Sequence, residues 1–282
     1  MIRRASVRRV AGGCGAAKGE MNMGMNRRQM MGTAAGVAAG LMMGAAGCQE
    51  SKIKMSKASF LNYGSEHFYN KDGSFNVEKA KAAYFEMMRY YNYPIPEVLK
   101  TDAFWVCDFL QRDLAKLGMG GIFWINAKGV YGENGAKAYK GEFADKNYGY
   151  LGHEIYLLPG QVLPEHRHVG GAEGYGPKME SWQVRYGEVE FFGEYKGAGD
   201  ETLISDMPES ERPWGFGQDW FKSKYVVKRT AKSGQIYTLE DPESWHFQRA
   251  GKTGAIVTEY ATYHNHVVFS KPGMEFSSSA AI

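Results

Sequence analysis

The sequence predicts a mainly β protein built on a single barrel, with helices ahead of the barrel. After Gly118, short runs rich in Val, Ile, Tyr and Phe alternate with turn residues, as in sandwiches and barrels. The composition agrees, because 14% of the residues are aromatic and 36 are glycine. A length of 282 residues is compatible with one all-β domain. We expect strands near 121–126, 149–158, 161–168, 180–186, 188–195, 224–230, 235–239 and 254–263.

The first residues have the order of an export signal rather than of a fold. A twin arginine, Arg27-Arg28, precedes an apolar run, residues 30–47, that is too short and too glycine-rich for a transmembrane helix. We therefore expect a twin-arginine signal over residues 1–48. Lipidation of Cys48 would be the only contact with a membrane, and cleavage with release of a soluble protein is the alternative. Either way, the protein is expected to be exported, as a periplasmic protein or an anchored lipoprotein.

Helical periodicity begins after residues 49–75, a polar segment that we expect to be a linker. Asn76 stands at an N-cap position, and apolar side chains then recur every three to four residues up to Tyr91. A second helix is expected from Thr101, ending before Gly118. Its apolar stripe would be Val106, Leu110, Leu114 and Leu117. The folded domain is expected to cover residues 76–282.

Charge and cysteine content narrow the class of protein. The formal net charge is +3, but the export segment is basic, so the remaining body is mildly acidic and nucleic acid is not an expected partner. Of Cys14, Cys48 and Cys107, only Cys107 belongs to the expected domain, which excludes an intrachain disulfide. Cys107 follows two aromatic residues and a valine, and we expect it in the core.

Residues 197–223 form a long polar segment that contains four aromatic residues. Segments of this length without regular structure are uncommon in a compact domain unless they serve a function. Two interpretations remain open. The segment is either an aromatic lid over a site or a surface excursion that packs on its own aromatic side chains.

The strongest functional signal is a pair of histidines, His166 and His168. Residues i and i+2 of a strand face the same side, so both imidazoles are predicted to point into the barrel while Arg167 points outward. Buried neutral imidazoles need hydrogen-bond partners, whereas a metal ion uses one nitrogen of each ring and leaves the other for a supporting partner. The pair therefore predicts a metal site. A barrel that has kept its shape without a metal is the alternative.

The spacing around this pair resembles the first motif of the cupins, which are double-stranded β-helix barrels: G-x5-H-x-H-x(3–4)-E-x6-G. Gly160 fits its first position. Two glutamates compete for the acidic position. Glu173 has the shorter spacing after His168, whereas Glu180 is followed by Gly187 as the motif requires. We choose Glu180, because it opens a predicted strand and would be held rigidly, and treat the preceding residues as an insertion.

The fourth ligand is expected from a later strand, where His246 loosely fits the second cupin motif. Three imidazoles and one carboxylate suit one divalent metal ion and leave positions for water or substrate. We expect Mn²⁺ first, although the spacing also allows Fe, Co, Ni or Zn. The predicted metal ligands are His166, His168, Glu180 and His246.

Over residues 97–273 the sequence resembles the D-lyxose isomerase family, whose members are cupin-type aldose–ketose isomerases. The resemblance is carried by residues 105–109, 117–118, 125–129, 164–168, 178–180, 245–247 and 257–260. It implies a metal-dependent isomerase that acts on free sugars through an enediolate, interconverting D-lyxose and D-xylulose or D-mannose and D-fructose. It also implies Glu259 as the base that moves the proton between C1 and C2, and Lys178 as an acid or electrostatic partner. Taken alone, Glu259 could equally be a solvated strand residue, and Lys178 a surface lysine at the end of a loop.

Two departures from the family leave other functions open. The Lys-x-Glu of the family follows the histidine pair almost directly, and the family shows Asn and Asp residues where this chain has residues 263–266. His264 and His266 are two residues apart and would share one face of a strand, so both face the site or both lie on a polar rim of the barrel. His67 and His153 are expected to have no role in the site. The alternative functions are a non-catalytic exported sugar-binding cupin and, less favoured, a cupin oxygenase. We expect a homodimer, since cupins often pair through sheet edges.

Overall fold

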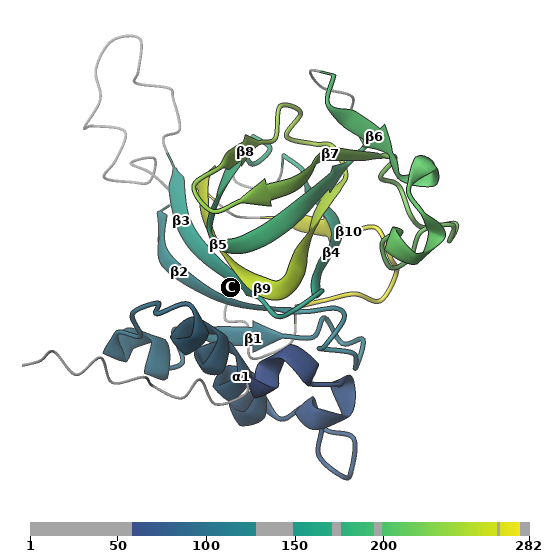
Figure 1. Ribbon diagram of the computed structural model, residues 1–282. Coiled ribbons are helices and arrows are strands. Elements are labelled where there is room, and N and C mark those ends of the chain that lie inside the picture. Colours follow the sequence, from purple (N-terminus) through teal and green to yellow (C-terminus); the bar gives the residue numbers. More distant parts are fainter. Residues whose placement is uncertain (1–57, 128–148, 171–175, 195–198, 264–265, 277–282) are drawn as a thin grey trace, which may run out of the picture. The chain divides into compact units, whose positions relative to one another are not determined.

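The computed structural model describes residues 58–127, 149–170, 176–194, 199–263 and 266–276. The chain divides into two units, residues 1–52 and 53–282, and every described residue belongs to the second. In that unit the strands curl into a barrel, and helical segments lie against one side of it (Figure 1). The expected export signal lies outside the described residues.

The barrel consists of antiparallel strands. They are β1 (Trp105–Cys107), β2 (Met119–Ala127), β3 (Tyr150–Leu157), β4 (Val162–His168), β5 (Glu180–Gly193), β6 (Glu201–Leu203), β7 (Tyr225–Lys232), β8 (Ile236–Thr238), β9 (His246–Thr262) and β10 (Val267–Phe269). Strands β5 and β9 are long and take part in two sheets. One sheet has the order β1-β2-β3-β9-β5-β8, and the other has the order β10-β4-β9-β5-β7-β6.

Two glycines allow β5 and β9 to bend from one sheet into the other. Gly187 and Gly254 both have a φ of +77°, in the left-handed region that side chains disfavour. A Cβ atom on Gly187 would lie 2.1 Å from the carbonyl oxygen of Gly254, so the two backbones approach too closely for any side chain there. The pairing register of β5 and β9 shifts on both sides of Gly187, where the strands bend.

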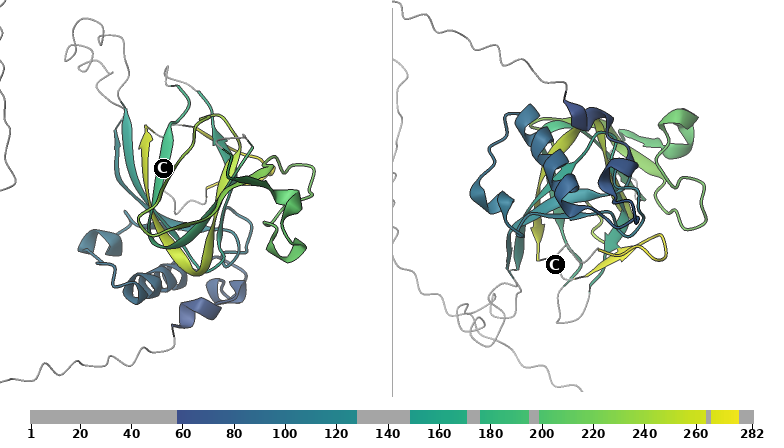
Figure 2. Two further views of the ribbon diagram at one scale, coloured as in Figure 1. Left: turned by 45° about the horizontal axis from the view of Figure 1, so that its top comes forward. Right: turned by 90° about the horizontal axis from the view of Figure 1, so that it is seen from below.

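Helix α1 (Val77–Tyr90) covers the outer face of the first sheet, as the view from below shows (Figure 2). The Asn76 side chain caps it by accepting a hydrogen bond from the backbone N–H of Lys79 at 3.0 Å, as the sequence predicted. Side chains of β3 alternate across the sheet: Tyr156 packs on the helix, whereas Ile155 faces the barrel interior. This alternation separates the helix-facing core from the core inside the barrel.

Part of the segment expected to be a linker is folded. Two 3₁₀ helices, Ser59–Asn62 and Ser65–Phe68, place Phe60 and Phe68 in the core beneath α1. Further 3₁₀ helices lie at Glu97–Lys100, Ile204–Asp206 and Glu209–Glu211. None of the described helices is long and apolar enough to cross a membrane.

The second helix predicted from Thr101 is wrong. Trp105–Cys107 instead forms β1 and pairs with β2, and the residues after it form turns. Phe109, Leu110 and Arg112 have positive φ angles, which no right-handed helix contains. The helix-like spacing of the apolar residues therefore arose from a strand followed by a turn, and Leu110 of the expected stripe is 54% exposed.

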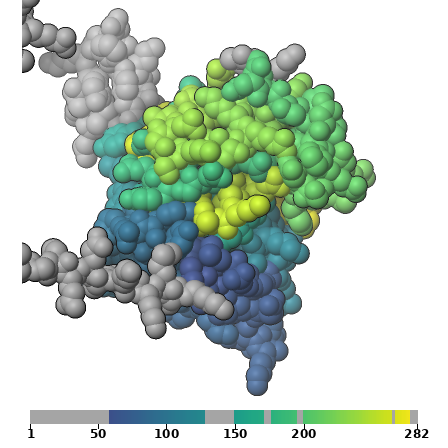
Figure 3. Space-filling model, in the orientation of Figure 1, coloured from purple at the N-terminus to yellow at the C-terminus, as the bar shows by residue number. Residues whose placement is uncertain are grey.

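The excursion between β5 and β7 packs on its own aromatic side chains. Its described residues, 199–223, contain β6 and a Trp214–Trp220 ring pair 5.4 Å apart. Ile204 and Met207 are buried against Phe247 of the barrel. In the space-filling view this green segment covers one flank, beside the yellow C-terminal residues (Figure 3). None of residues 199–223 lines the histidine pocket described below, which favours the surface excursion over the lid.

The predicted fold, a mainly β single barrel of the cupin type with N-terminal helical segments, is confirmed. The strands expected at 180–186 and 188–195 are one continuous strand, β5, and β9 begins at His246 rather than near residue 254. Three short strands, β1, β6 and β10, were not expected from the sequence. Cys107 is buried in the barrel core, where its Sγ accepts a hydrogen bond from the backbone N–H of Phe109 at 3.3 Å.

Candidate metal centre and active-site pocket

Three histidines meet inside the barrel where β4 lies beside β9. His166 of β4 is the direct Cα partner of His246 of β9, and their rings lie 4.5 Å apart. His168 follows two residues after His166 on the same face of β4, with 5.0 Å between their rings. One ring nitrogen of each histidine lies within 4.8 Å of the others, and all three residues are buried. The three histidines form a candidate metal centre.

The backbone fixes the orientation of all three rings. The Nδ1 atoms of His166, His168 and His246 lie 2.7, 3.2 and 2.9 Å from the carbonyl oxygens of Pro164, His266 and Ser244. A carbonyl oxygen can only accept a hydrogen bond, so each Nδ1 carries the proton and each Nε2 of a neutral ring presents a lone pair. Metal-binding histidines show this arrangement, with one nitrogen donating to a carbonyl while the other faces the ion.

Glu180 adds a carboxylate to the same point. It is the first residue of β5, where its side chain is 3% exposed. Its oxygens lie 2.9 Å from Nε2 of His168 and 3.6 Å from Nε2 of His246. Arg167, between the two histidines of β4, stacks its guanidinium over Trp245 at 4.8 Å and does not join the site. Glu173, the competing glutamate, lies outside the described residues.

Lys178 and Glu259 form a second charged group in the same pocket, next to Glu180. The ammonium of Lys178 contacts the carboxylate of Glu259 directly and lies 3.3 Å from Glu180. Lys178 precedes β5, whereas Glu259 comes from β9 opposite Trp182 of β5. Lys178 is 5% exposed and Glu259 3%, so neither is the surface residue that the sequence alone allowed.

Burial and the neighbouring charges set the protonation states of these groups. Burial lowers the pKa of His166 well below 6.5 and also lowers that of His168, so both rings are neutral at pH 7. Burial opposes the charge of Lys178, but the carboxylates of Glu180 and Glu259 outweigh it and leave the lysine pKa raised. Burial likewise opposes the charge of Glu259, yet Lys178 and the hydrogen bond from His153 lower its pKa to about 2. The pKa of Glu180 also lies well below its usual value, since Lys178 and His168 outweigh burial.

His153 is the site residue that the sequence did not identify. It lies on β3 as the Cα partner of Glu259, and its Nδ1 atom is 2.8 Å from Oε2 of that glutamate. One signal was available in the sequence: alternation with the apolar Ile155 and Leu157 predicts a side chain that points into the barrel. The pairing of β3 with β9 is a long-range contact, which spacing along the chain does not show.

The side chains of the other two described histidines lie apart from this group. His67 stacks on Tyr63 with 3.9 Å between the rings. His266 is exposed, and only its backbone carbonyl reaches the site, where it accepts the hydrogen bond from His168. His264 lies outside the described residues.

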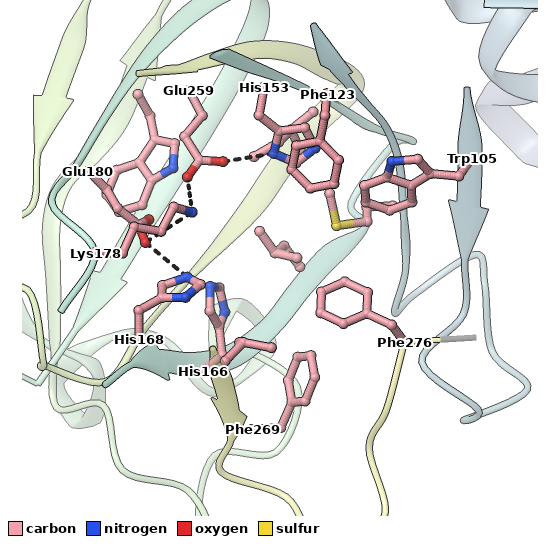
Figure 4. Close-up of a pocket in the computed structure, with 15 residues that line it drawn as sticks. Trp105, Phe123, His153, His166, His168, Lys178, Glu180, Glu259, Phe269 and Phe276 are labelled. Carbon is pink, nitrogen blue, oxygen red and sulfur yellow. Dashed lines mark hydrogen bonds and ion pairs between the residues drawn. The ribbon is translucent and has the colours of Figure 1, made fainter. Parts of the chain in front are cut away.

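The pocket has a polar half and an aromatic half (Figure 4). His166, His168, Lys178, Glu180 and Glu259 line one side, and Trp105, Phe123 and Phe276 lie on the other side of the cavity. Phe269 lies beside His166, its Cα partner on the neighbouring strand. His153 stands at the junction of the two halves.

Solved structures similar to this chain include two L-ribose isomerases. The enzyme of Cellulomonas parahominis with L-psicose has a TM-score of 0.47 and 19% identity, over 73% of this chain and 95% of that one. The enzyme of Acinetobacter sp. DL28 with L-ribose has a TM-score of 0.49 and 16% identity, over 74% and 95% of the two chains.

No protein-family model matches the chain, but curated relatives do. It is 34% identical over 116 residues to the D-lyxose/D-mannose isomerase of Thermosediminibacter oceani, which is 40% of this chain and 56% of that protein. It is 30% identical over 118 residues to a D-lyxose ketol-isomerase of a Thermofilum species, which is 41% of this chain and 58% of that protein. The chain thus spans somewhat more than half the length of the curated relatives it matches.

Proposed function

We propose that this protein is a metal-dependent aldose–ketose isomerase acting on free sugars, with D-lyxose and D-mannose as the first substrates to test. The observation that carries the proposal is the position of Lys178 and Glu259 in the pocket that also holds the histidine centre. A cation centre beside a buried acid–base pair suits proton transfer next to a carbonyl group. The names of the two curated relatives support the same reaction.

The donor set fits one divalent ion. Three imidazoles, each with its Nδ1 atom on a backbone carbonyl, turn their Nε2 atoms toward one point, and the Glu180 carboxylate lies against two of them. Lone pairs that face one another in a buried site repel unless a cation lies between them. The charge balance also favours a cation, because the two buried carboxylates of Glu180 and Glu259 share the ammonium group of Lys178. We propose His166, His168, Glu180 and His246 as the ligands and Mn²⁺ as the ion, with Fe, Co, Ni and Zn as alternatives.

The chain's own residues can carry out the proton transfers. When bound, the ion would act as a Lewis acid toward the oxygens on C1 and C2 of the sugar. Glu259 is ionised at neutral pH, so its carboxylate can accept the proton from C2 and return it to C1. The Lys178 ammonium would stabilise negative charge that develops on the substrate oxygens and exchange a proton with them. The net change is one hydrogen moved between carbons and one between oxygens, with no external oxidant.

The test combines metal analysis with an aldose panel. Purified protein is expected to hold about one divalent ion per chain and to form D-xylulose from D-lyxose or D-fructose from D-mannose. The Glu259→Gln variant should keep the metal and lose turnover by about 10²–10⁴-fold. Glu209→Gln, an exposed glutamate outside the pocket, is the matched control and should behave as the parent protein. Metal and sugar binding without ketose formation would indicate a sugar-binding protein, and oxygen consumption with bound iron would indicate an oxygenase.

We also propose, from the sequence, that the chain is exported by a twin-arginine route, is anchored through lipid on Cys48, and forms a homodimer. Cell fractionation with and without a Cys48→Ala substitution tests the anchor. A Lys-Lys replacement of Arg27-Arg28 tests the route, because this export route requires the arginine pair. Light scattering on the purified mature protein gives the oligomeric state.

A further inference from the structure

We propose that the pocket selects aldoses whose carbon farthest from the reacting pair is a methyl group, that is, 6-deoxyhexoses. The proposal rests on the proposed isomerase function, because it assumes that C1 and C2 lie at the histidine centre beside Glu259. It concerns the apolar half of the pocket, to which the proposed metal binding and proton transfer assign no role. Figure 4 shows Trp105, Phe123 and Phe276 of that half on the other side of the cavity from Lys178 and Glu180.

The far half is apolar throughout its described lining. Its members are Trp105, Met119, Phe123, Ile155, Leu163 and Phe276, and it is continued up to the histidine centre by Val267 and Phe269, the Cα partners of His168 and His166. They come from β1, β2, β3, β4, β10 and the segment after β10, so the wall is assembled from most of the chain rather than from one loop.

The aromatic members support one another and form a continuous surface. Phe276 makes edge contacts with Phe269 at 5.4 Å and with Trp105 at 6.2 Å between ring centroids. Trp105 in turn lies 5.8 Å from Phe123. The surface begins beside the histidine centre, where Phe269 is 6.1 Å from His166, and it ends where Phe123 stacks on His153 at 4.4 Å. Rings held from both sides in this way leave little room for rearrangement around a ligand.

Among the described residues that line this half, one side chain can form a hydrogen bond. Of the eight residues named above, Trp105 is the one with a polar side-chain atom, and its Nε1 is buried without a partner among the described residues. A sugar hydroxyl placed against the rings leaves water and gains at most that one donor, which cannot satisfy the proton of the hydroxyl. Burial of a hydroxyl without compensation lowers affinity by roughly tenfold or more. A methyl group at the same place gains contact with the rings instead.

D-Mannose and 6-deoxy-D-mannose provide a matched substrate pair, because they share their configuration and differ in a single hydroxyl group. With metal-loaded protein, kcat/KM is expected to be about tenfold or more higher for 6-deoxy-D-mannose. Equal values, or a preference for D-mannose, would overturn the methyl subsite and leave the isomerase function intact.

Two variants test whether the wall causes the preference. Phe269→Tyr and Phe276→Tyr each add a hydroxyl to the aromatic half while keeping the ring. At least one of them is expected to narrow the preference several-fold, mainly by raising kcat/KM for D-mannose. Phe216→Tyr, in the excursion outside the pocket, is the matched control and should retain the parent ratio. An unchanged ratio in both pocket variants would contradict the assignment.

A binding measurement separates this proposal from the proposed reaction. Calorimetry compares D-mannitol with 6-deoxy-D-mannitol, neither of which can be isomerised. If no aldose of the panel, D-lyxose included, gives a ketose, the isomerase proposal fails. The subsite then stands if 6-deoxy-D-mannitol binds about tenfold or more tightly than D-mannitol, and falls if it does not.

Discussion

The Nδ1 atom of His153 lies 2.8 Å from Oε2 of Glu259. The glutamate is ionised and can only accept, so Nδ1 donates the proton. The imidazole stacks on Phe123 with 4.4 Å between ring centroids and also lies against Trp105 at 5.6 Å, and its Nε2 is buried without a partner among the described residues. A ring in this setting has one polar contact, and that contact orients the proposed base.

Substitutions at His153 should change the pH dependence of catalysis. His153→Leu removes the donor at similar size, and the pKa of Glu259 should rise because one of the groups that lowers it is lost. The acid limb of the kcat/KM profile should therefore move to higher pH, and kcat should fall by roughly tenfold or more. His153→Asn keeps an N–H group near the position of Nδ1, so it should largely retain the parent acid limb and the parent kcat. His153→Gln should retain neither. Identical acid limbs in the Leu and Asn variants would show that the contact has no electrostatic role.

The metal-free protein should lose stability as the pH falls below 6.5. His166 and His168 have lowered pKa values in the folded state, so between 6.5 and their folded values the unfolded chain binds more protons. Their contribution is fully present above pH 6.5 and is lost below it, by up to about 1.4 kcal/mol per pH unit for each histidine. Urea unfolding in EDTA at about pH 7.5, 6.5 and 5.5 measures the slope, and His166→Gln should reduce it. An equal slope in that variant would assign the loss to other groups.

Removal of the metal should lower the melting temperature. An ion that binds only the folded chain adds about 2.7 kcal/mol at one hundred times its Kd. For a domain of this size that corresponds to roughly 5–10 °C. Thermal scans of the Mn²⁺-loaded protein with and without EDTA should show the difference, and His246→Ala should remove it. A His246→Ala protein that retained the full response to EDTA would indicate a different metal site.

Any side chain at Gly187, where β5 bends beside Gly254, should lower the free energy of unfolding. Gly187→Ala places a Cβ atom in a left-handed conformation and 2.1 Å from the carbonyl oxygen of Gly254. Gly160 also has a positive φ, of +69°, but nothing lies within 4 Å of its Cβ position, so Gly160→Ala serves as the matched control. The control should lose about 1–2 kcal/mol of unfolding free energy, from the backbone conformation alone. Gly187→Ala should lose clearly more, and equal losses would show that the close approach is relieved at no cost.

The parts of the site that could be predicted from sequence are those with local spacing. His166 and His168 share a strand, so the period of two places both inside the barrel, and Glu180 begins the next predicted strand. The positions of Lys178 and Glu259 were open from the residues alone, since each depends on the pairing of β5 with β9 across about eighty residues. The contact of His153 with Glu259 depends in the same way on β3.

The fold shows the same division between local and long-range information. Asn76 and the periodic apolar residues after it predicted α1, because capping and helical spacing are local. Val106 and Leu114 also have helical spacing, but Val106 lies in β1, and the partner of β1 is β2, which begins only at Met119. The Phe-Trp-Val-Cys composition of that stretch favours a strand, and it outweighed the period of the apolar residues.

Strand β9 carries His246 at its first residue and Glu259 near its other end. The proposed ligand and the proposed base are thus mounted on one uninterrupted length of backbone, and their separation does not depend on how any loop folds. Insertion of one residue between them would turn one of the two side chains out of the barrel. Engineering of new substrate preferences should therefore leave this stretch at its present length and alter the walls around it.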